Sequence, residues 1–391
     1  MRTIRLTILF LLTTLISYAQ QSPYKMARTK GLLPFLEYGP GDDRLGGAKM
    51  TYLDSGVLVK VIDSLNSDYI IALTDNLRAF IAKTSVQFDP QLQPKPYYLS
   101  GNWKTYREER FDVITISMPE RLPYRSIMQV NPNRLIIDLF GITSNTNWIT
   151  QKGLTSELRN TWFEQMENGV LRVYADLKSS MHWGHSVHYD SIGSRLVIKV
   201  KHAPDKKMHN LFVAVDAGHG GDNSGAAGNF SGKLEKNLTL VYANALEKEL
   251  KKNGIKKVFM TRQKDTSLSM PERIMMLRDT LPDLLISIHF NSSSVDTVKG
   301  TSTFYRHIGF RPLTQSILKR MTALGLDEFG NVGSFNFALS GPTEYPNCLV
   351  EVAFLSNRKD EQFILNKTTP AKVARAIRLG ITDWLKSHSL P

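Results

Sequence analysis

Short apolar runs separated by turn residues fill the first half of the chain. Between residues 48 and 88 the runs lie at 57–61, 69–73 and 79–81, with Gly, Ser, Asn and Asp between them. Short strands at this spacing are typical of small all-β domains. The pattern therefore predicts a small β-barrel over residues 45–88.

Two stretches rich in proline or glycine flank this predicted barrel. The first covers residues 34–47, and the second covers 89–104 with Pro90, Pro94 and Pro96. Such clusters mark turns and extended connections rather than regular elements. Both stretches are predicted to be linkers.

A second β-rich region follows at residues 105–202. Its strand-like segments lie at 112–116, 135–139, 169–177 and 195–200. Alternation of apolar and polar residues sends one row of side chains into a core and the other toward solvent. We expect a second small all-β module here.

After Ala203-Pro204-Asp205 the pattern changes to alternating strands and helices. Strands are predicted at 211–215, 257–260, 284–290, 301–305 and 348–353. Helices are predicted at 234–252, from Ser269 onward, and at 311–324 and 371–387. The fold class is therefore α/β over residues 210–391, with a central sheet flanked by helices and preceded by the two small all-β modules.

The N-terminus has the pattern of a secretory signal. Arg2 and Arg5 precede an apolar run at 6–16, and Ser17-Tyr18-Ala19 provides small residues before a cut ahead of Gln20. The run is shorter than the roughly 20 residues of a membrane-spanning helix. We expect residues 1–19 to be a signal peptide and the chain to act in the periplasm or cell envelope. Contact with the membrane is expected only if the signal is not cleaved.

The charge balance is basic, with 49 Lys and Arg against 36 Asp and Glu, a net charge of +13. The excess fits an anionic polymer such as the cell wall or a nucleic acid, and equally a solvated basic surface. The one cysteine, Cys348, cannot form an internal disulfide. It is interpreted as a buried apolar residue in a strand, with a catalytic thiol as the alternative.

Four polar segments stand at the ends of apolar runs in the α/β region. They are Asp216–Gly221, Lys233–Asn237, Ser287–Asn291 and Leu349–Asn357. In an open α/β sheet the carboxyl ends of the strands face one crevice, where ligands bind. We therefore expect these segments to meet.

The four segments contain the side chains of a zinc hydrolase. His219 follows one strand, His289 ends another, and Glu235 begins a helix after a glycine-rich loop. Two imidazoles and a carboxylate are a ligand set of catalytic zinc, which lowers the pKa of a bound water from about 15.7 to about 7. Glu351, in an apolar strand interpreted as buried, is the remaining carboxylate and is expected to transfer the proton.

In their order these segments resemble the N-acetylmuramoyl-L-alanine amidases of the amidase-3 family, over about 180 residues. Thr261-Arg262, Leu268 and Arg273 also match that family. The resemblance implies Zn²⁺ held by His219, Glu235 and His289, with Glu351 as the catalytic acid and base. It implies cleavage of the amide between N-acetylmuramic acid and L-alanine, so the expected partner is peptidoglycan and not nucleic acid.

The two β modules have resemblances of their own. Residues 45–88 resemble a bacterial SH3-like domain. The motifs Asn-Pro-x-Arg-Leu-Ile-Ile-Asp-Leu at 131–139 and Val-Leu-Arg-Val-Tyr-Ala-Asp-Leu at 170–177 resemble the AMIN domain. Both resemblances imply modules that bind the wall or tether the chain to it.

Two features depart from the family pattern. Ser340 stands where family members usually carry an arginine, which leaves substrate contact at this point open. The 61 residues between His289 and Glu351 are too few for the zinc-blocking insertion of some division amidases. We expect constitutive activity or control by the N-terminal modules, with an activator protein left open as a partner. A many-fold rise in activity on removal of the residues before Asn210 would indicate control.

Other interpretations compete with the zinc amidase. One is a wall-binding protein with an inactive amidase domain, and another is a zinc peptidase that cuts a different acyl–amine bond. A second histidine cluster, His182, His185 and His188, does not converge in strand geometry, since His185 would face away from the other two. These histidines are predicted to be surface or wall-contacting residues.

Overall fold

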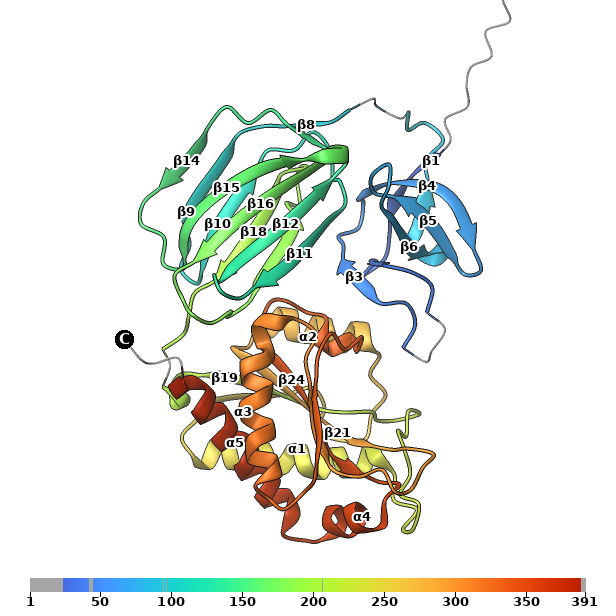
Figure 1. Cartoon of the computed structure of the whole chain (residues 1–391), viewed down its shortest axis with the longest axis vertical. Helices are drawn as coiled ribbons and strands as arrows, with labels where there is room; N and C mark the ends of the chain where they lie inside the picture. The colour runs from blue at the N-terminus through green and yellow to red at the C-terminus, as the bar shows by residue number, and fades with distance from the viewer. Residues whose placement is uncertain (1–23, 42–44, 94, 96, 206, 388–391) are drawn as a thin grey trace, which may run out of the picture.

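The computed structural model describes residues 24–41, 45–93, 95, 97–205 and 207–387, in two β-rich parts above an α/β part (Figure 1). The predicted signal peptide at 1–19 lies outside the described residues. Within those residues, no helix combines the length and apolarity needed to cross a membrane.

The first module is a strongly bent seven-stranded sheet in the order β3-β2-β6-β5-β4-β1-β7. Its strands are β1 (Lys25–Thr29), β2 (Phe35–Glu37), β3 (Lys49–Tyr52), β4 (Leu58–Leu65), β5 (Asp68–Ala72), β6 (Arg78–Ala82) and β7 (Val86–Phe88). The prediction that 34–47 is only a linker was wrong, because β2 lies inside it and pairs with β3 and β6. The sheet also includes β1, which lies between β4 and β7 with Met26, Ala27 and Thr29 buried.

The second module packs a five-stranded sheet, β14-β9-β10-β18-β17, against a four-stranded sheet, β11-β12-β16-β15. The strands are β8 (Leu99–Ser100), β9 (Trp103–Arg107), β10 (Phe111–Ile116), β11 (Tyr124–Gln129), β12 (Arg134–Phe140), β13 (Thr143–Ser144), β14 (Ile149–Lys152), β15 (Leu158–Met166), β16 (Val170–Leu177), β17 (His185–Tyr189) and β18 (Leu196–Lys201). The alternating pattern predicted the strands at 112–116, 135–139, 169–177 and 195–200 well. The strand β8 lies inside the predicted second linker and pairs with β13, which lies outside it.

The cores of the two β modules are continuous. One hydrophobic cluster contains Leu36 and Ile71 from the first module and Trp103 and Ile114 from the second. Phe310, from the C-terminal part, is buried in the same cluster. All three parts of the chain thus contribute to one buried apolar volume.

The C-terminal part contains a six-stranded sheet in the order β20-β19-β21-β24-β22-β23. Its strands are β19 (Phe212–Ala217), β20 (Lys257–Met260), β21 (Leu284–Asn291), β22 (Thr301–Phe304), β23 (Glu328–Val332) and β24 (Asn347–Phe354). Its helices are α1 (Glu235–Lys252), α2 (Met270–Thr280), α3 (Arg311–Thr322), α4 (Arg358–Leu365) and α5 (Thr369–Ser387). Neighbouring strands are parallel except β22 and β24, and the predicted α/β class is confirmed.

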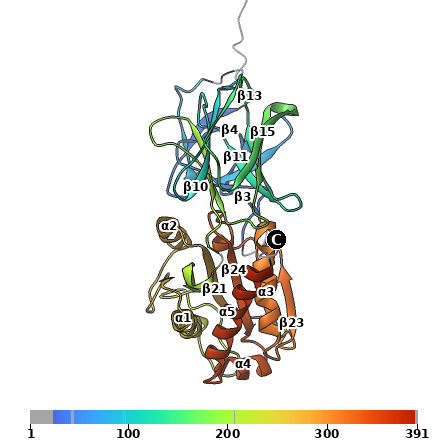
Figure 2. The same cartoon turned by 90° about the vertical axis from the view of Figure 1, so that its left-hand side faces the viewer.

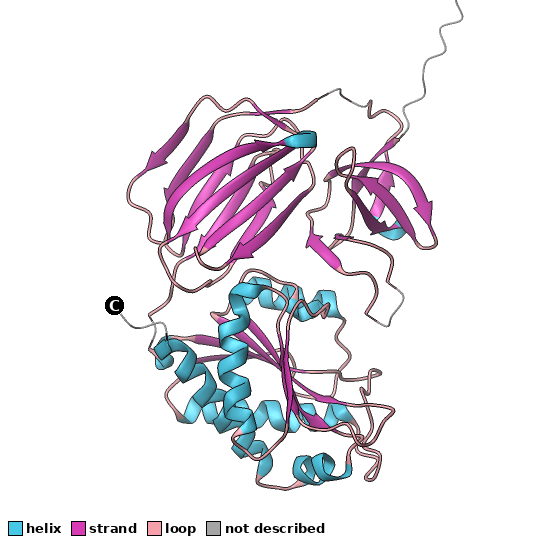
Figure 3. Cartoon of the chain, viewed as in Figure 1, coloured by secondary structure: helices cyan, strands magenta, loops and turns pink. Residues whose placement is uncertain are grey.

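Helices cover the two faces of this sheet unequally (Figures 2 and 3). Even-numbered residues of β21 and β24 pack against α1, α3 and α5 in one large cluster. On the other face, Ala214 and Leu285 pack against α2. The odd-numbered residues of β21 share this second face, because side chains alternate along a strand.

The helix α2 begins where its sequence predicted. The Ser269 hydroxyl accepts a hydrogen bond from the Glu272 amide, and the Glu272 carboxylate accepts one from the Ser269 amide. This capping box satisfies two amides that the first helical turn leaves without partners.

Candidate metal centre

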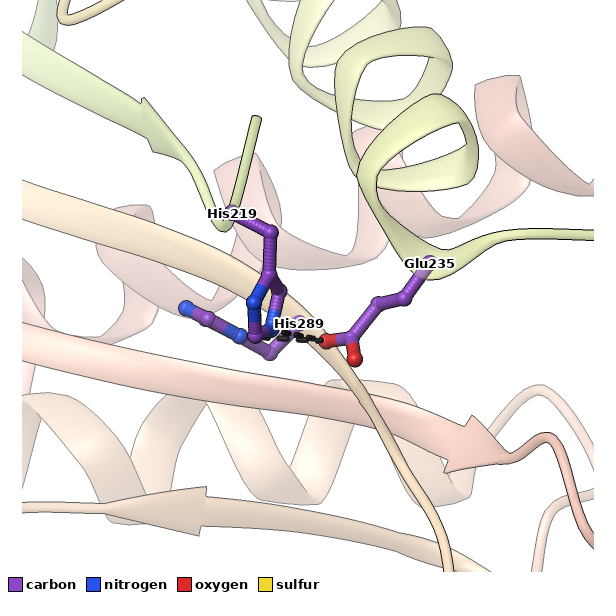
Figure 4. Close-up of side chains that lie close together, drawn as sticks. All are labelled: His219, Glu235 and His289. Atoms are coloured by element: carbon purple, nitrogen blue, oxygen red, sulfur yellow. Dashed lines mark hydrogen bonds and ion pairs between the residues drawn. The ribbon is translucent and has the colours of Figure 1, made fainter. Parts of the chain in front are cut away.

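Three side chains from separate elements point toward one another at the carboxyl edge of the sheet (Figure 4). His219 follows β19, Glu235 begins α1 and His289 lies on β21. Glu235 Oε1 is 3.0 Å from His219 Nε2 and 3.1 Å from His289 Nδ1. Candidate ligand atoms of all three lie within 4.8 Å of one another. The predicted convergence of these residues is therefore present.

The backbone at His219 is in the left-handed region, with φ of 60°. Non-glycine residues are uncommon there and concentrate at functional sites. His219 Nδ1 is 2.8 Å from Asn223 Oδ1, which is an acceptor. In a neutral ring the proton therefore lies on Nδ1, and the Nε2 lone pair is available to a metal ion beside Glu235. In a protonated ring Nε2 also carries a proton and donates it to Glu235 Oε1. Sequence reasoning did not single out Asn223, since an asparagine in a glycine-rich loop has the appearance of a turn residue.

The Glu235 carboxylate is almost fully buried and fixed by two backbone amides. Oε1 accepts from Phe290 N at 3.0 Å, and Oε2 accepts from Ala226 N at 2.9 Å. Burial favours the neutral acid, but the hydrogen bonds with His219 and His289 outweigh it and lower the carboxyl pKa. For His219, burial likewise disfavours the cation, yet the hydrogen bond with Glu235 leaves its pKa raised.

The loops around the cluster have glycine at two positions where a Cβ atom would collide with the cluster. A Cβ on Gly218 would come within 2.2 Å of His289 Cε1. A Cβ on Gly225, where φ is 67°, would come within 2.5 Å of Glu235 Oε2. Side chains at these two positions would occupy the space that the cluster needs.

The residues present fit a zinc ion. Donor atoms about 2.1 Å from a tetrahedral zinc lie about 3.4 Å apart, close to the two separations at Glu235 Oε1. His289 is 6% exposed, and its Nε2 has no hydrogen-bond partner among the described residues. Two imidazoles aimed at one carboxylate oxygen are unusual unless a cation or proton lies between them. The set is consistent with Zn²⁺.

A buried ion pair supports the segment before His219. Asp216 accepts from Arg273 Nη1 at 2.6 Å, Thr261 Oγ1 at 2.7 Å and Ser287 Oγ at 2.6 Å. Burial would raise the Asp216 pKa, but the Arg273 charge and the hydrogen bonds lower it. Arg273 also donates to the carbonyl oxygens of Ala217 and His219. These contacts fix the backbone from which His219 projects.

A second arginine holds the same loop. Arg262 donates to Ala217 O at 2.9 Å and to Gly218 O at 2.8 Å. It also donates to Lys236 O, in the first turn of α1 that Glu235 begins. The sequence match at Thr261, Arg262 and Arg273 thus marks residues that position the cluster.

Glu351 lies beside the cluster on β24. It is the direct cross-strand partner of His289, so the two side chains share the α2 face of the sheet. The expectation that Glu351 is buried was wrong, since it is half-buried between fully buried Val350 and Val352. It is the one residue of β24 that is not fully buried, and its side chain lies on the second face of the sheet.

The segment before β24 forms another side of the cluster. The Phe337 ring stands edge-on to the His289 ring, with centroids 5.4 Å apart and an interplanar angle of 83°. Ser340 is 1% exposed and comes directly after Leu339, which belongs to the cluster on the second face. Its hydroxyl is therefore directed away from solvent at the position where a substrate contact was left open.

The prediction that the second histidine cluster lies at the surface was wrong. His182 and His185 are buried where the second module meets the C-terminal part, and His188 is half-buried. Main-chain pairing explains the burial, because His185 N donates to Thr343 O at 2.8 Å. Cys348 is buried in β24, and burial raises its thiol pKa, in line with the apolar interpretation.

Comparison with known proteins concerns the C-terminal part. A family model described as N-acetylmuramoyl-L-alanine amidase matches residues 213–383. The protein YqiI of Bacillus subtilis is 31% identical over 176 residues, covering 44% of this chain and 84% of YqiI. N-acetylmuramoyl-L-alanine amidase LytC of B. subtilis is 30% identical over 179 residues, covering 44% of this chain and 35% of LytC.

Among solved structures, the catalytic domain of CwlV, an amidase from Bacillus (Paenibacillus) polymyxa, is 33% identical. The match covers 45% of this chain and 98% of that catalytic domain, with a TM-score of 0.43.

Proposed function

Because the chain belongs to the N-acetylmuramoyl-L-alanine amidase family, we propose that it hydrolyses the amide between N-acetylmuramic acid and L-alanine in peptidoglycan. The observation that carries this proposal is the convergence of His219, Glu235 and His289, with Glu351 in register beside them. These three residues are the proposed ligands of Zn²⁺, and Glu351 is the proposed acid and base. The activity serves wall remodelling, separation of daughter cells or recycling.

The reaction divides between the metal and the protein. Bound zinc supplies Lewis acidity, which polarises the scissile carbonyl and acidifies water. Glu351 takes a proton from the attacking water as the new C–O bond forms. It returns that proton to the alanine nitrogen as the C–N bond breaks. The products are the lactyl carboxylate of the muramic acid and a peptide with a free alanine amine.

The protein's other contribution is to fix the reacting groups. Asn223 sets the tautomer of His219, and the amide of Phe290 orients Glu235. Arg273 and Asp216 hold the backbone between β19 and His219. Groups fixed in this way need no reorganisation when charge develops in the transition state.

The test is Glu351→Gln in the full chain, with Glu328→Gln on the exposed end of β23 as a control. We expect the first variant to retain zinc and to release peptides from purified sacculi at least about 100-fold more slowly. Mass spectrometry of wild-type products should show peptides beginning with alanine. Binding without release would instead indicate the inactive wall-binding protein, and cleavage elsewhere in the peptide would indicate a zinc peptidase.

We further propose that the β modules are SH3-like at 45–88 and AMIN-like at 105–202, and that they bind the wall. The outer face of the four-stranded sheet supports this. Trp162 and Tyr174 stack with centroids 5.0 Å apart, and the Arg134 guanidinium lies 4.6 Å from the Trp162 centroid. Aromatic faces beside charged groups suit a polar polymer such as glycan. Trp162→Ala should weaken sedimentation with sacculi and leave the rate on soluble muropeptides unchanged.

A cell-wall amidase acts outside the cytoplasm, and we propose the periplasm or cell envelope as its place. An activator protein is a further proposed partner. Unimpaired activity of the purified chain on sacculi would argue against a need for one.

A further inference from the structure

The first module forms several hydrogen bonds with one side chain of the C-terminal part, Asn336. Asn336 Oδ1 accepts from Lys49 N at 3.0 Å, and Asn336 Nδ2 donates to Gly47 O at 2.7 Å and Leu45 O at 3.2 Å. These partners are main-chain groups in the turn before β3 and at its start. One amide side chain is thus held from both its donor and its acceptor side by another module.

Apolar contacts between the two parts surround these hydrogen bonds. Leu33 and Tyr52 of the first module pack against the second-face cluster, which contains Ile274 of α2 and Leu339. A Cβ on Gly341 would come within 2.9 Å of the Tyr52 ring, so the two parts approach closely. The first module therefore lies on the same sheet face as His289 and Glu351.

Asn336 lies next to the metal centre in the fold. Phe337, next to Asn336, places its ring edge-on to His289, and Phe335 stacks on Phe337 at 6.3 Å. Arg306 Nη1 donates to Asn336 Oδ1 at 3.0 Å from the β22 side. A displacement of Asn336 would move the aromatic wall beside a proposed zinc ligand.

We propose that the first module is a fixed part of the catalytic unit, and that Asn336 is the positioning residue through which it shapes the aromatic wall beside the metal centre. The module holds Asn336, Asn336 holds Phe337, and Phe337 forms a wall beside His289. The inference rests on the proposed amidase function. It assigns to the first module a role in substrate binding at the metal centre, separate from any binding of the wall.

The first test compares Asn336→Ala with Asn331→Ala in the full chain. Asn331 lies in the same region, but its side-chain amide donates to Thr303 Oγ1 and Thr314 Oγ1, both within the C-terminal part. We expect Asn336→Ala to raise the KM for soluble muropeptides about fivefold or more, with kcat and zinc content little changed. Asn331→Ala should lower the melting temperature and leave KM unchanged. Equal KM values for the two variants would overturn the proposal.

The second test approaches the contact from the other module. A Cβ on Gly47 would come within 2.1 Å of Gly39 O, so Gly47→Ala must shift the turn that receives Asn336. It should raise KM as Asn336→Ala does, and the double variant should be no worse than either single one, because both remove the same contact. Additive effects would contradict the coupling.

Two further measurements separate the possible failures. Hydrogen exchange should become faster at the Lys49 amide and across residues 335–341 in Asn336→Ala, a readout that does not depend on activity. Phe337→Leu should reproduce the rise in KM if the coupling passes through the ring. An inactive wild-type chain would refute the amidase proposal, whereas an active one with unchanged KM in Asn336→Ala would refute only this inference.

Discussion

Within the described residues, two groups of histidines are buried or half-buried, and one of them has the features of a metal centre. His219 and His289 face the Glu235 carboxylate at about 3 Å at the edge of the sheet, and the backbone at His219 is left-handed. His182, His185 and His307 lie at the junction with the second module. There, His182 Nε2 contacts Gln129 O and His307 Nε2 contacts Gly341 O.

The difference lies in what surrounds the rings rather than in their burial. After burial itself, the groups that act on the pKa values of the junction histidines are the other histidines, Arg306 and backbone carbonyls. At the metal centre the dominant partner is a carboxylate. A cation is therefore favoured at the first group, whereas neutral rings are favoured at the second.

The largest contrast is expected between His289→Ala and His185→Leu. The first should abolish zinc binding and lower activity by about 1,000-fold or more, because it removes a ligand. Both ring nitrogens of His185 are without hydrogen-bond partners among the described residues. An apolar replacement there should leave zinc and activity intact and should not lower the melting temperature. Loss of zinc in His185→Leu, measured by elemental analysis, would remove the distinction between the two groups.

The metal centre depends on buried charge, so Arg273→Met should be severe. It leaves Asp216 buried without its cation, at a cost of about 3–5 kcal/mol in the free energy of unfolding. Urea denaturation would measure this cost, with Arg375→Met on the exposed side of α5 as the control. Adding Asp216→Asn to Arg273→Met should recover part of the lost free energy of unfolding. If Arg273→Met costs less than about 1 kcal/mol, the metal centre does not depend on buried charge.

The smallest effect is expected at the histidines of the junction with the second module, where a loss of fold stability should appear only at acidic pH. Burial, opposed by the hydrogen bond to Gly341 O, lowers the pKa of His307 to about 4 from 6.5. A depressed pKa stabilises the fold above pH 6.5, and this stability, about 3 kcal/mol, is lost as the pH falls toward 4.

His307→Gln keeps a donor for Gly341 O but cannot titrate. Its melting temperature should therefore fall less than that of the wild type between pH 7.5 and pH 4.5. His182 and His185 also have lowered pKa values and face the same junction, so some acid sensitivity should remain. An identical fall in both proteins would exclude His307 as a source.

Local pattern predicted the elements that carry the metal centre. The helix expected at 234–252 is α1, and the strand expected at 284–290 is β21. Parallel strands deliver their carboxyl ends to one edge, so the meeting of His219 and His289 followed from the order of elements. The half-burial of Glu351 did not, because the exposure of one side chain inside a buried strand depends on which loops cover that face of the sheet.

Contacts between modules could not be read from the sequence. The histidines at 182–188 had a polar, surface-like pattern, yet Gly309 allows a close approach to the His182 ring, where a Cβ would come within 2.6 Å. The turn at 45–47 had the pattern of a linker, but its carbonyl oxygens accept from Asn336. Both depend on residues more than 100 positions away in the chain.

The burial of Phe310 in the core of the β modules limits how the chain can be cut. Removing the residues before 210 would expose this ring and the apolar residues of the α2 face to solvent. The remaining C-terminal part would then tend to aggregate. A shorter amidase made in this way would test solubility as much as control. Transplanting the C-terminal part onto other binding modules would first require a polar residue in place of Phe310.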